Sequence, residues 1–290
     1  IWHLAQDLPP LDLLQGYQPS LVTTVYADDR QPIGQFFIER RTLTPLENIP
    51  KTLTQAVIAT EDVRFFEHPG LDYIGILRAA WTNIRHGGKK VEGASTITQQ
   101  LARSLFLSAE RSYDRKLREL ILAYKMEAVS TKEQILETYL NQIYFGQGAY
   151  GVASAAQSYF GKEIGKLTLA ESAFLGGLPK SPSRFSPFTN YERAKKRQEH
   201  VLSRMEEAGF ISAAERDAAI AEELKFRRPG SEHVAPFGCY RCAYGHEVDA
   251  QGQPLRPFVN DVMQEMSVLV PQLQTQMPGA NHAQVLQAAY

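Results

Sequence analysis

The 290-residue chain lacks two features that would narrow its class at once. No apolar run reaches the about 20 residues that a membrane-spanning helix needs. Neither charge sign is in excess, since 31 Lys and Arg face 32 Asp and Glu, and this near-neutral balance gives no indication of a nucleic-acid partner. The remaining composition, 43% hydrophobic and 22% charged, is that of a globular chain with one large domain or one and a half.

Cysteine is also scarce. The two cysteines, Cys239 and Cys242, form a Cys-Tyr-Arg-Cys motif with His233 and His246 nearby. A redox motif, half of a zinc site and a local disulfide all fit this spacing. Zinc needs four ligands of suitable geometry, so one short cysteine pair is weak evidence, and no metal ligands are predicted. An extracytoplasmic location would favour a disulfide or two idle thiols.

The pattern along the chain predicts a mainly α protein with a small N-terminal β-hairpin. Residues 1–20 are rich in proline and leucine and are typical of a linker. Residues 21–26 and 36–40 are β-branched or alternate in polarity, with turn residues between them, which predicts the hairpin. After Pro45 and Pro50, most segments have helical periodicity. Residues 227–253 are polar and glycine-rich, so the helical domain is predicted to end near residue 226.

Several helices have recognisable starts and faces. Asp72 is predicted to cap a helix with the apolar residues Ile74, Leu77, Trp81 and Ile84 on one face. Core packing is expected for most of Ile74, Leu77 and Trp81. The helix that starts at Asp114 is apolar on two sides and is therefore expected to be buried. Capping boxes are predicted at four places. They are Thr96–Gln99, Thr131–Gln134, Thr168–Glu171 and Ser212–Glu215.

The segment from Glu61 to Gly70 is the strongest candidate for chemistry. It places the pair Glu61 and Asp62 at a helix end, close to Phe65 and His68. Rings that keep water away suit a carboxylate whose pKa must rise toward neutrality. The alternative is an acidic cap exposed to solvent, and the ten residues alone do not decide between the two.

Glu119 is the second candidate carboxylate. It lies on the second side of the helix predicted after Asp114, beside Arg115, Leu122 and Met126. A buried carboxylate needs a partner or a function. Arg115 is four residues away, so a simple ion pair along the helix remains the structural alternative.

Five segments, in this order, resemble the peptidoglycan glycosyltransferase domain of class A penicillin-binding proteins and monofunctional glycosyltransferases. They are Glu61–Gly70, Gly93–Gln100, Arg115–Glu119, Lys132–Asn141 with Gly146, and Leu169–Pro179. The resemblance covers roughly residues 26–211. It implies a lysozyme-like helical fold. It also implies an enzyme that polymerises lipid II into β-1,4-linked glycan strands, with inversion and release of undecaprenyl pyrophosphate.

The resemblance also implies roles for individual residues. Glu61 would be the general base and Glu119 a second carboxylate near the leaving pyrophosphate. The pyrophosphate would be held by the residues Arg103, Arg115, Lys116, Thr96 and Gln100. The residues Asp62, Phe65 and His68 would support Glu61 in binding substrate. No cofactor is required by the sequence; a divalent cation, Mg or Mn, bridging the pyrophosphate is compatible with it.

Three regions follow from this resemblance: a post-membrane linker at 1–20, the glycosyltransferase domain at 21–226, and a linker or insertion at 227–290. The last region resembles the segment that leads toward the transpeptidase domain of class A proteins. The chain has neither a Ser-x-x-Lys nor a Lys-Thr-Gly motif, so no penicillin-binding site is expected within it. A bifunctional protein cut short is favoured over a monofunctional one. A single membrane anchor is expected before Ile1, with the domain on the periplasmic side of the cytoplasmic membrane. The resemblance also implies that the helix after Asp72 lies against the bilayer, so the alternative to core packing is that some of its apolar residues face lipid. The expected partners are lipid II, the lipid-linked glycan strand, the bacterial membrane and other cell-wall synthesis proteins.

Two other functions use the same residues. A lysozyme-like glycan-cleaving enzyme would also use two carboxylates. The basic residues around Arg103 and Arg115 argue against it, since a hydrolase of neutral glycan has no pyrophosphate to bind. A non-catalytic glycan-binding module would keep the fold, but the presence of both Glu61 and Glu119 favours an enzyme.

Overall fold

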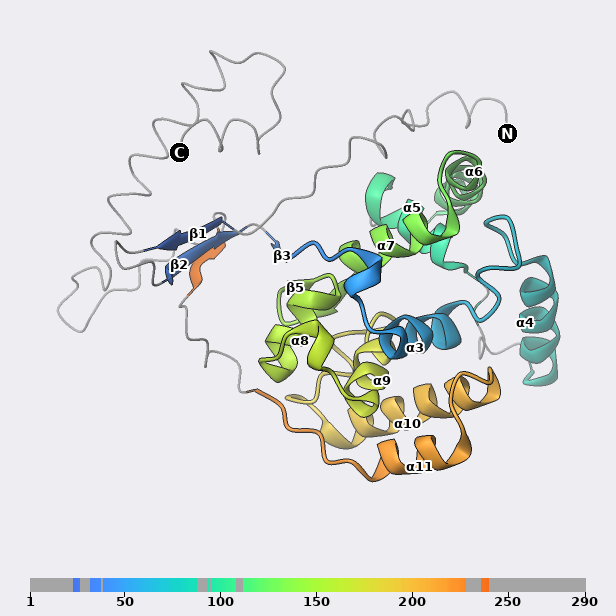
Figure 1. The fold of residues 1–290 in the computed structure, drawn as a ribbon. Helices are drawn as coiled ribbons and strands as arrows, with labels where there is room; N and C mark the ends of the chain where they lie inside the picture. The colour runs from blue at the N-terminus through green and yellow to red at the C-terminus, as the bar shows by residue number, and fades with distance from the viewer. Residues whose placement is uncertain are drawn as a thin grey trace, which may run out of the picture. The chain divides into compact units, whose positions relative to one another are not determined.

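A computed structural model describes residues 23–26, 32–37, 39–87, 93, 95–107, 112–227 and 236–239. These residues belong to two compact units, a helical unit from Arg40 onward and a small strand unit. Figure 1 shows the helices of the first unit and the strands β1 and β2 of the second. Predictions for residues 1–20, for most of 227–290 and for Cys242 lie outside the described residues.

The helical unit confirms the prediction of a mainly α fold. Its helices are α3 (Lys51–Glu61), α4 (Tyr73–Arg85), α5 (Ile97–Phe106), α6 (Tyr113–Val129), α7 (Lys132–Gln142), α8 (Val152–Phe160), α9 (Leu169–Gly177), α10 (Tyr191–Glu207) and α11 (Ala213–Ala221). Two short 3-10 turns, η1 (Leu46–Asn48) and η2 (Ile164–Lys166), accompany them. Three short strands, β3 (Arg40–Arg41), β4 (Tyr144–Gly146) and β5 (Ala149–Tyr150), form a sheet in the order β3-β5-β4.

The strand unit contains the predicted hairpin. Strand β1 (Thr23–Tyr26) pairs antiparallel with β2 (Pro32–Phe37), so a hairpin is present. Its second strand lies at 32–37 and not at the predicted 36–40, so the predicted bounds of that strand were wrong. The sequence placed this hairpin in the same domain as the helices. In the structure it instead groups with β6 (Pro236–Cys239), which lies parallel to β2. A partner strand some 200 residues away leaves no local signal in the sequence, which is why β6 was not predicted.

Most of the predicted helix caps are present. Thr131, Thr168 and Ser212 each form a complete capping box. Thr96 caps α5 by accepting a hydrogen bond from the backbone N–H of Gln99 at 3.2 Å. The predicted return bond from the Gln99 side chain is absent, because its Oε1 accepts from Lys116 Nζ at 3.0 Å. The prediction of a complete capping box at Thr96 was therefore wrong, because the Gln99 side chain bonds to Lys116 of another helix and not to the Thr96 backbone.

Helix α9 forms the centre of the core. Every residue from Ala170 to Gly177 is buried, and α9 packs against both α3 and α10. The close approach depends on Gly176, where a Cβ atom would lie 2.8 Å from the Cβ of Ala56 in α3. Figure 1 shows α3, α9 and α10 next to one another. This packing fixes α3, and with it Glu61 at the last position of α3.

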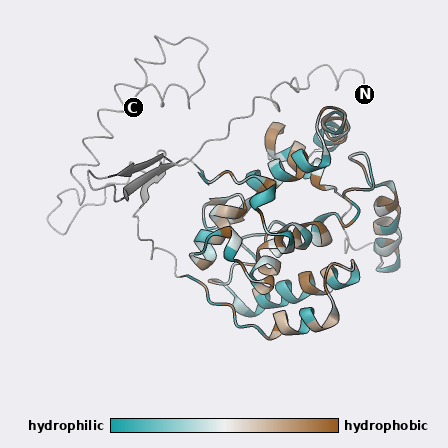
Figure 2. Cartoon of the chain, in the orientation of Figure 1, coloured by the Kyte–Doolittle hydropathy of each residue, from teal (hydrophilic) through white to brown (hydrophobic). Residues whose placement is uncertain are grey.

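Two helices depart from the expected burial. In α4, Ile74, Leu77 and Trp81 are 59%, 72% and 61% exposed, so the core packing expected for them was wrong. In α6 the face with Glu119 is buried, while Leu117 and Tyr124 on the other face are exposed. Figure 2 shows brown, hydrophobic positions among teal, hydrophilic ones along α4. Periodicity shows that a helix has an apolar face, but it does not show what covers that face.

No helix among the described residues is both long and apolar enough to cross a membrane.

Candidate active site

Glu61 lies where three helices meet. Its Oε2 atom accepts a hydrogen bond from Gln100 Nε2 of α5 at 3.0 Å. Its Oε1 atom lies 3.8 Å from Arg197 Nη2 of α10. The Glu61 side chain is only 11% exposed. The carboxylate is therefore partly withdrawn from water and held on both oxygens, as a positioned base requires.

Burial raises the pKa of Glu61 above its ordinary value. The hydrogen bond from Gln100 opposes this rise, and so do three nearby positive charges. These charges belong to Arg197, Lys180 and Arg103. The net effect is a carboxyl group whose pKa is closer to neutrality, and such a group takes up a proton more readily than an exposed carboxylate. The direction of this shift is the one that a general base needs, and the role of Glu61 as a base stays a prediction.

The Gln100 side chain is held in turn by Tyr139 of α7. The Tyr139 hydroxyl donates to Gln100 Oε1 at 3.2 Å, and the ring is fully buried. Burial, and then the negative charge of Glu61, raise the pKa of Tyr139 well above its ordinary value, so the hydroxyl keeps its proton. A chain of hydrogen bonds therefore runs from Tyr139 through Gln100 to Glu61.

Glu119 is the centre of a second charged cluster. Its side chain is 1% exposed, and three cations surround it. Lys116 Nζ lies 2.9 Å from one carboxylate oxygen, while Arg115 Nε and Arg103 Nη1 lie 3.4 and 4.0 Å from the other. The predicted ion pair between Arg115 and Glu119 is present, but it is one part of this larger cluster. Three positive charges against one negative charge leave a surplus that suits a polyanion.

Arg103 connects the two carboxylates. It approaches Glu119 directly, and its charge also acts on Glu61. Its side chain is 39% exposed and that of Lys116 is 42% exposed, so both cations remain accessible to a ligand. Lys116 Nζ additionally donates to Ser95 Oγ and Gln99 Oε1, both at 3.0 Å. The structure thus brings together Glu61, Glu119, Gln100, Arg103, Arg115 and Lys116 from the predicted set.

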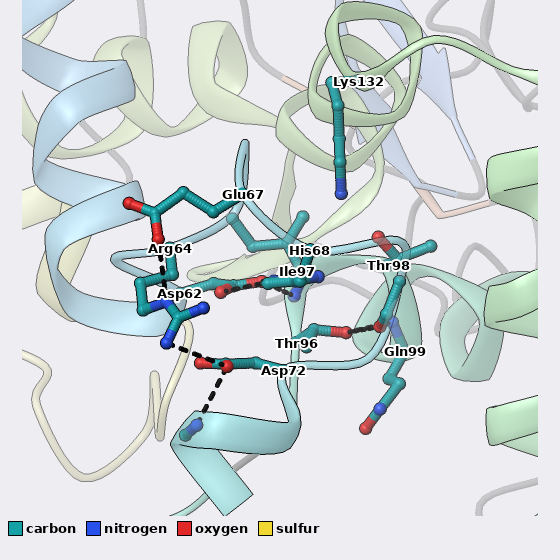
Figure 3. Close-up of polar contacts among 12 residues, drawn as sticks. Asp62, Arg64, Glu67, His68, Asp72, Thr96, Ile97, Thr98, Gln99 and Lys132 are labelled. Carbon is teal, nitrogen blue, oxygen red and sulfur yellow. Dashed lines mark hydrogen bonds and ion pairs between the residues drawn. The ribbon is translucent and has the colours of Figure 1, made fainter.

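Asp62 and His68 form a buried pair behind this cluster. His68 Nε2 lies 3.0 and 3.1 Å from the two Asp62 oxygens, and the backbone N–H of Ile97 donates to Asp62 at 3.0 Å. Figure 3 shows these residues together. Ile97 is the first residue of α5, and Asp62 directly follows Glu61 in the chain. This hydrogen bond therefore attaches α5, the helix with Gln100 and Arg103, to the end of α3. These contacts hold the start of α5, and the predicted role of Asp62 and His68 in binding substrate stays a prediction.

Thr96 and Phe65 also support the site from within the protein. The Thr96 hydroxyl donates to the Gly70 carbonyl at 2.7 Å and accepts from Gln99, so both of its hydrogen-bonding functions are occupied. Phe65 is fully buried, with Lys132 Nζ 4.4 Å from its ring centre. Neither side chain is placed to contact a ligand directly in this conformation, and their predicted substrate binding stays a prediction.

The loop between α3 and α4 is held by a separate ion-pair group. Arg64 Nε lies 2.9 Å from Glu67, and Arg64 Nη1 lies 3.7 Å from Asp72 (Figure 3). Asp72 also accepts from the backbone N–H of Gly75 at 2.9 Å, which confirms it as the cap of α4. These contacts set the geometry of the segment that follows Glu61.

The sequence analysis did not identify Arg197 or Lys180. Arg197 is 8% exposed, and its Nε donates to the Gly177 carbonyl at 2.9 Å, which aims the guanidinium at Glu61. A signal was available, since Arg197 lies between Ala194 and Val201 on the buried face of α10. A charged residue in a core-facing position needs a buried partner. Lys180 is exposed after α9, where sequence pattern gives no such signal.

No group of three or more His, Cys, Asp or Glu side chains within the described ranges is arranged to hold a metal ion. The partly exposed side chains beside Glu119 are the cations Arg103 and Lys116, which can bind an anion directly. A divalent cation carried with the pyrophosphate stays a prediction.

The family model described as transglycosylase matches residues 29–206. The chain belongs to the transglycosylase family. The resemblance to the peptidoglycan glycosyltransferase domain of class A penicillin-binding proteins is thereby confirmed.

The relatives that match are named penicillin-binding protein 1A. The protein from Neisseria flavescens is 52% identical over 221 residues, which are 76% of this chain and 28% of the relative. The protein from Rickettsia typhi is 44% identical over 250 residues, 86% of this chain and 32% of the relative. A crystal structure of penicillin-binding protein 1A from Haemophilus influenzae is 29% identical with a TM-score of 0.42, covering 73% of this chain and 22% of that one. The chain spans about a third of the length of these curated relatives.

The raised pKa of Glu61 predicts a pH-dependent difference in stability. Between its ordinary pKa of 4.5 and the higher folded value, the native transglycosylase domain binds more protons than the unfolded chain, so its stability falls as pH rises through that window. Glu61→Gln removes this loss. We expect the difference in melting temperature, variant minus parent, to become more positive as the pH rises from below 4.5 toward neutrality. Thermal scans of both proteins across that range test it.

The control for that experiment is Glu67→Gln, because the Glu67 side chain is 65% exposed. Its difference from the parent should show no comparable rise with pH. A flat difference for Glu61→Gln would mean that Glu61 is not held at a raised pKa.

Proposed function

We propose that this transglycosylase domain polymerises lipid II into β-1,4-linked glycan strands and releases undecaprenyl pyrophosphate. One observation carries the proposal: Glu61, a withdrawn carboxylate of raised pKa, shares Arg103 with the cation cluster around Glu119. Acid–base chemistry at a hydroxyl needs the first group, and departure of a pyrophosphate needs the second.

The proposed step is a single displacement with inversion. The C4 hydroxyl of the acceptor sugar loses its proton to the Glu61 carboxylate. Its oxygen forms a bond to C1 of the donor glycan on the face opposite the leaving group. The bond from C1 to the phosphate oxygen breaks, and its electron pair leaves with undecaprenyl pyrophosphate. General-base assistance of this kind is typically worth ~10²–10⁴-fold in rate.

The leaving group would be stabilised by Arg103, Arg115 and Lys116. Arginine presents a planar set of donors that matches phosphate oxygens, and lysine adds a compact point charge. Glu119 holds the three cations in place and limits their mutual repulsion. A divalent cation, Mg or Mn, would further neutralise the pyrophosphate. No cofactor is otherwise required by this scheme.

The proposal places the domain beside the bacterial cytoplasmic membrane, on its periplasmic side. The exposed apolar side chains of α4, with Leu77 72% and Ile84 68% exposed, support a membrane-facing position. Such a position would bring the site to lipid II and to the growing lipid-linked strand. Other cell-wall synthesis proteins are proposed as further partners, and the membrane anchor is proposed to precede Ile1.

The test is to supply lipid II to the protein in detergent, and finished peptidoglycan in a parallel reaction, and to separate the products of each. We expect glycan strands together with undecaprenyl pyrophosphate, and we expect no soluble muropeptides from finished peptidoglycan. Muropeptide release without strand formation would support the lysozyme-like alternative and overturn the proposal. If neither product forms while labelled lipid II still binds, the domain is a non-catalytic glycan-binding module.

A further inference from the structure

Tyr139 carries a hydroxyl that packing alone does not explain. The ring lies in the core with Leu136 and Leu140, where a phenylalanine would fill the same space. Burying a phenol hydroxyl is unfavourable unless it is hydrogen-bonded. Its hydrogen bond goes to Gln100 Oε1, at 3.2 Å. The Tyr139 hydroxyl therefore contacts Gln100, the residue that donates a hydrogen bond to Glu61.

The hydrogen bonds to Tyr139 and to Glu61 together set how the Gln100 amide faces the carboxylate. An amide has an oxygen that only accepts and an NH₂ group that only donates. Because Tyr139 donates to the oxygen, the NH₂ group faces the other way, toward Glu61 Oε2 at 3.0 Å. The reverse orientation would point the amide oxygen at a carboxylate, which repels it.

We propose that Tyr139 is a positioning residue that fixes the orientation of the Gln100 amide, so that Gln100 always donates to the Glu61 carboxylate. This inference rests on the proposed function, since it assumes that Glu61 works as the base. Donation to a carboxylate favours its charged form, the form that can accept a proton from the acceptor sugar.

The other groups around Glu61 do not depend on Tyr139. They are Arg197 from α10, Lys180 after α9, Arg103 from α5 and the neighbouring Asp62. Arg197 has its own anchor in the Gly177 carbonyl. Loss of the Tyr139 hydroxyl would therefore leave these charges in place and change only the hydrogen bond from Gln100. Any change in the ionisation of Glu61 then reports on the amide.

The experiment compares Tyr139→Phe with Tyr159→Phe. Tyr159 is a matched control, because it is also fully buried and its hydroxyl donates to one protein oxygen, the Phe145 carbonyl, at 2.9 Å. Both variants lose one buried hydroxyl, so both should lower the melting temperature. The pH dependence of lipid II polymerisation should separate them.

In Tyr139→Phe we expect the acid side of the kcat profile to move to higher pH. Well below that limb the rate should be about tenfold lower than that of the parent, as for a weakened hydrogen bond to a charged group. The rate at higher pH and the KM for lipid II should stay close to parent values. Tyr159→Phe should keep the parent profile. An unmoved acid limb in Tyr139→Phe, or an equal movement in both variants, would overturn the inference.

A measurement on the parent protein tests the orientation without any activity. With glutamine labelled with ¹⁵N, the side-chain NH₂ signal of Gln100 should titrate together with Glu61, and this titration should disappear in Glu61→Gln. A Gln100 signal that is insensitive to pH would contradict the assigned orientation, even if Tyr139→Phe failed to fold. If the signal titrates but no glycan strands form, the orientation stands and the proposed function fails.

Discussion

Glu61→Gln should reduce lipid II polymerisation by about 10²–10⁴-fold, the usual contribution of a general base. Glutamine has nearly the same shape as glutamate but cannot take up the proton of the attacking hydroxyl. Burial raises the pKa of Glu61, so a neutral side chain is well tolerated at this position and the variant should fold. The loss should appear in kcat and not in the binding of labelled lipid II. Initial rates with saturating lipid II measure it.

Glu67→Gln provides the matched control for this prediction. Glu67 lies in the same segment and is exposed. Its Oε2 atom lies 2.9 Å from Arg64 Nε, and its carboxylate pairs with Arg64 and not with Gln100 or Arg197. It should keep the rate of the parent within about twofold, as for a surface substitution. Polymerisation by Glu61→Gln at a similar rate would show that another group is the base, although the domain would still be a polymerase.

Glu119→Gln should destabilise the protein by about 3 kcal/mol and also reduce polymerisation. Removing one partner from a buried ion pair costs about 3–5 kcal/mol, because the opposite charge is left uncompensated. The lower end of that range applies, since Arg103 and Lys116 reach solvent and are partly screened. Three cations would then repel one another at the proposed pyrophosphate site. Urea unfolding of the variant and the parent measures the loss.

Glu127→Gln is the control that tests whether the loss of stability depends on how many cations surround the carboxylate. Glu127 lies on the same helix and is 9% exposed, but it pairs with a single cation, Lys132, at 2.7 Å. Its loss of stability should be smaller. Inorganic pyrophosphate should restore the melting temperature of Glu119→Gln more than it raises that of the parent, because an anion can replace the missing carboxylate. Equal losses in the two variants, or no recovery with pyrophosphate, would contradict the cluster's proposed role.

The sequence predicted which residues belong to the site better than it predicted the contacts between them. Resemblance at the level of motifs pointed to Glu61, Glu119 and Arg103, and the structure brings them together. It did not predict that Gln100 bonds to Glu61, since the residue was expected to bind pyrophosphate. It also left out Arg197, which reaches Glu61 from 136 residues further along the chain. Contacts of this length depend on how α3, α5 and α10 pack.

The sequence by itself determined the local structure of this protein. Helix starts at Asp72, Thr131, Thr168 and Ser212 were predictable because a cap involves only residues within one turn. The β1–β2 hairpin was predictable because its strands are neighbours in the chain. The apolar faces of α4 and α6 could be recognised from periodicity as well.

Only the tertiary structure decided which faces are covered and how Glu61 is tuned. The apolar face of α4 is exposed, while the face of α6 with Glu119 is buried, and periodicity alone predicts neither outcome. The pKa of Glu61 depends on water excluded by packing and on charges contributed by Arg197, Lys180 and Arg103. Burial and Coulomb interactions depend on distance in space, which the order of residues along a chain does not specify.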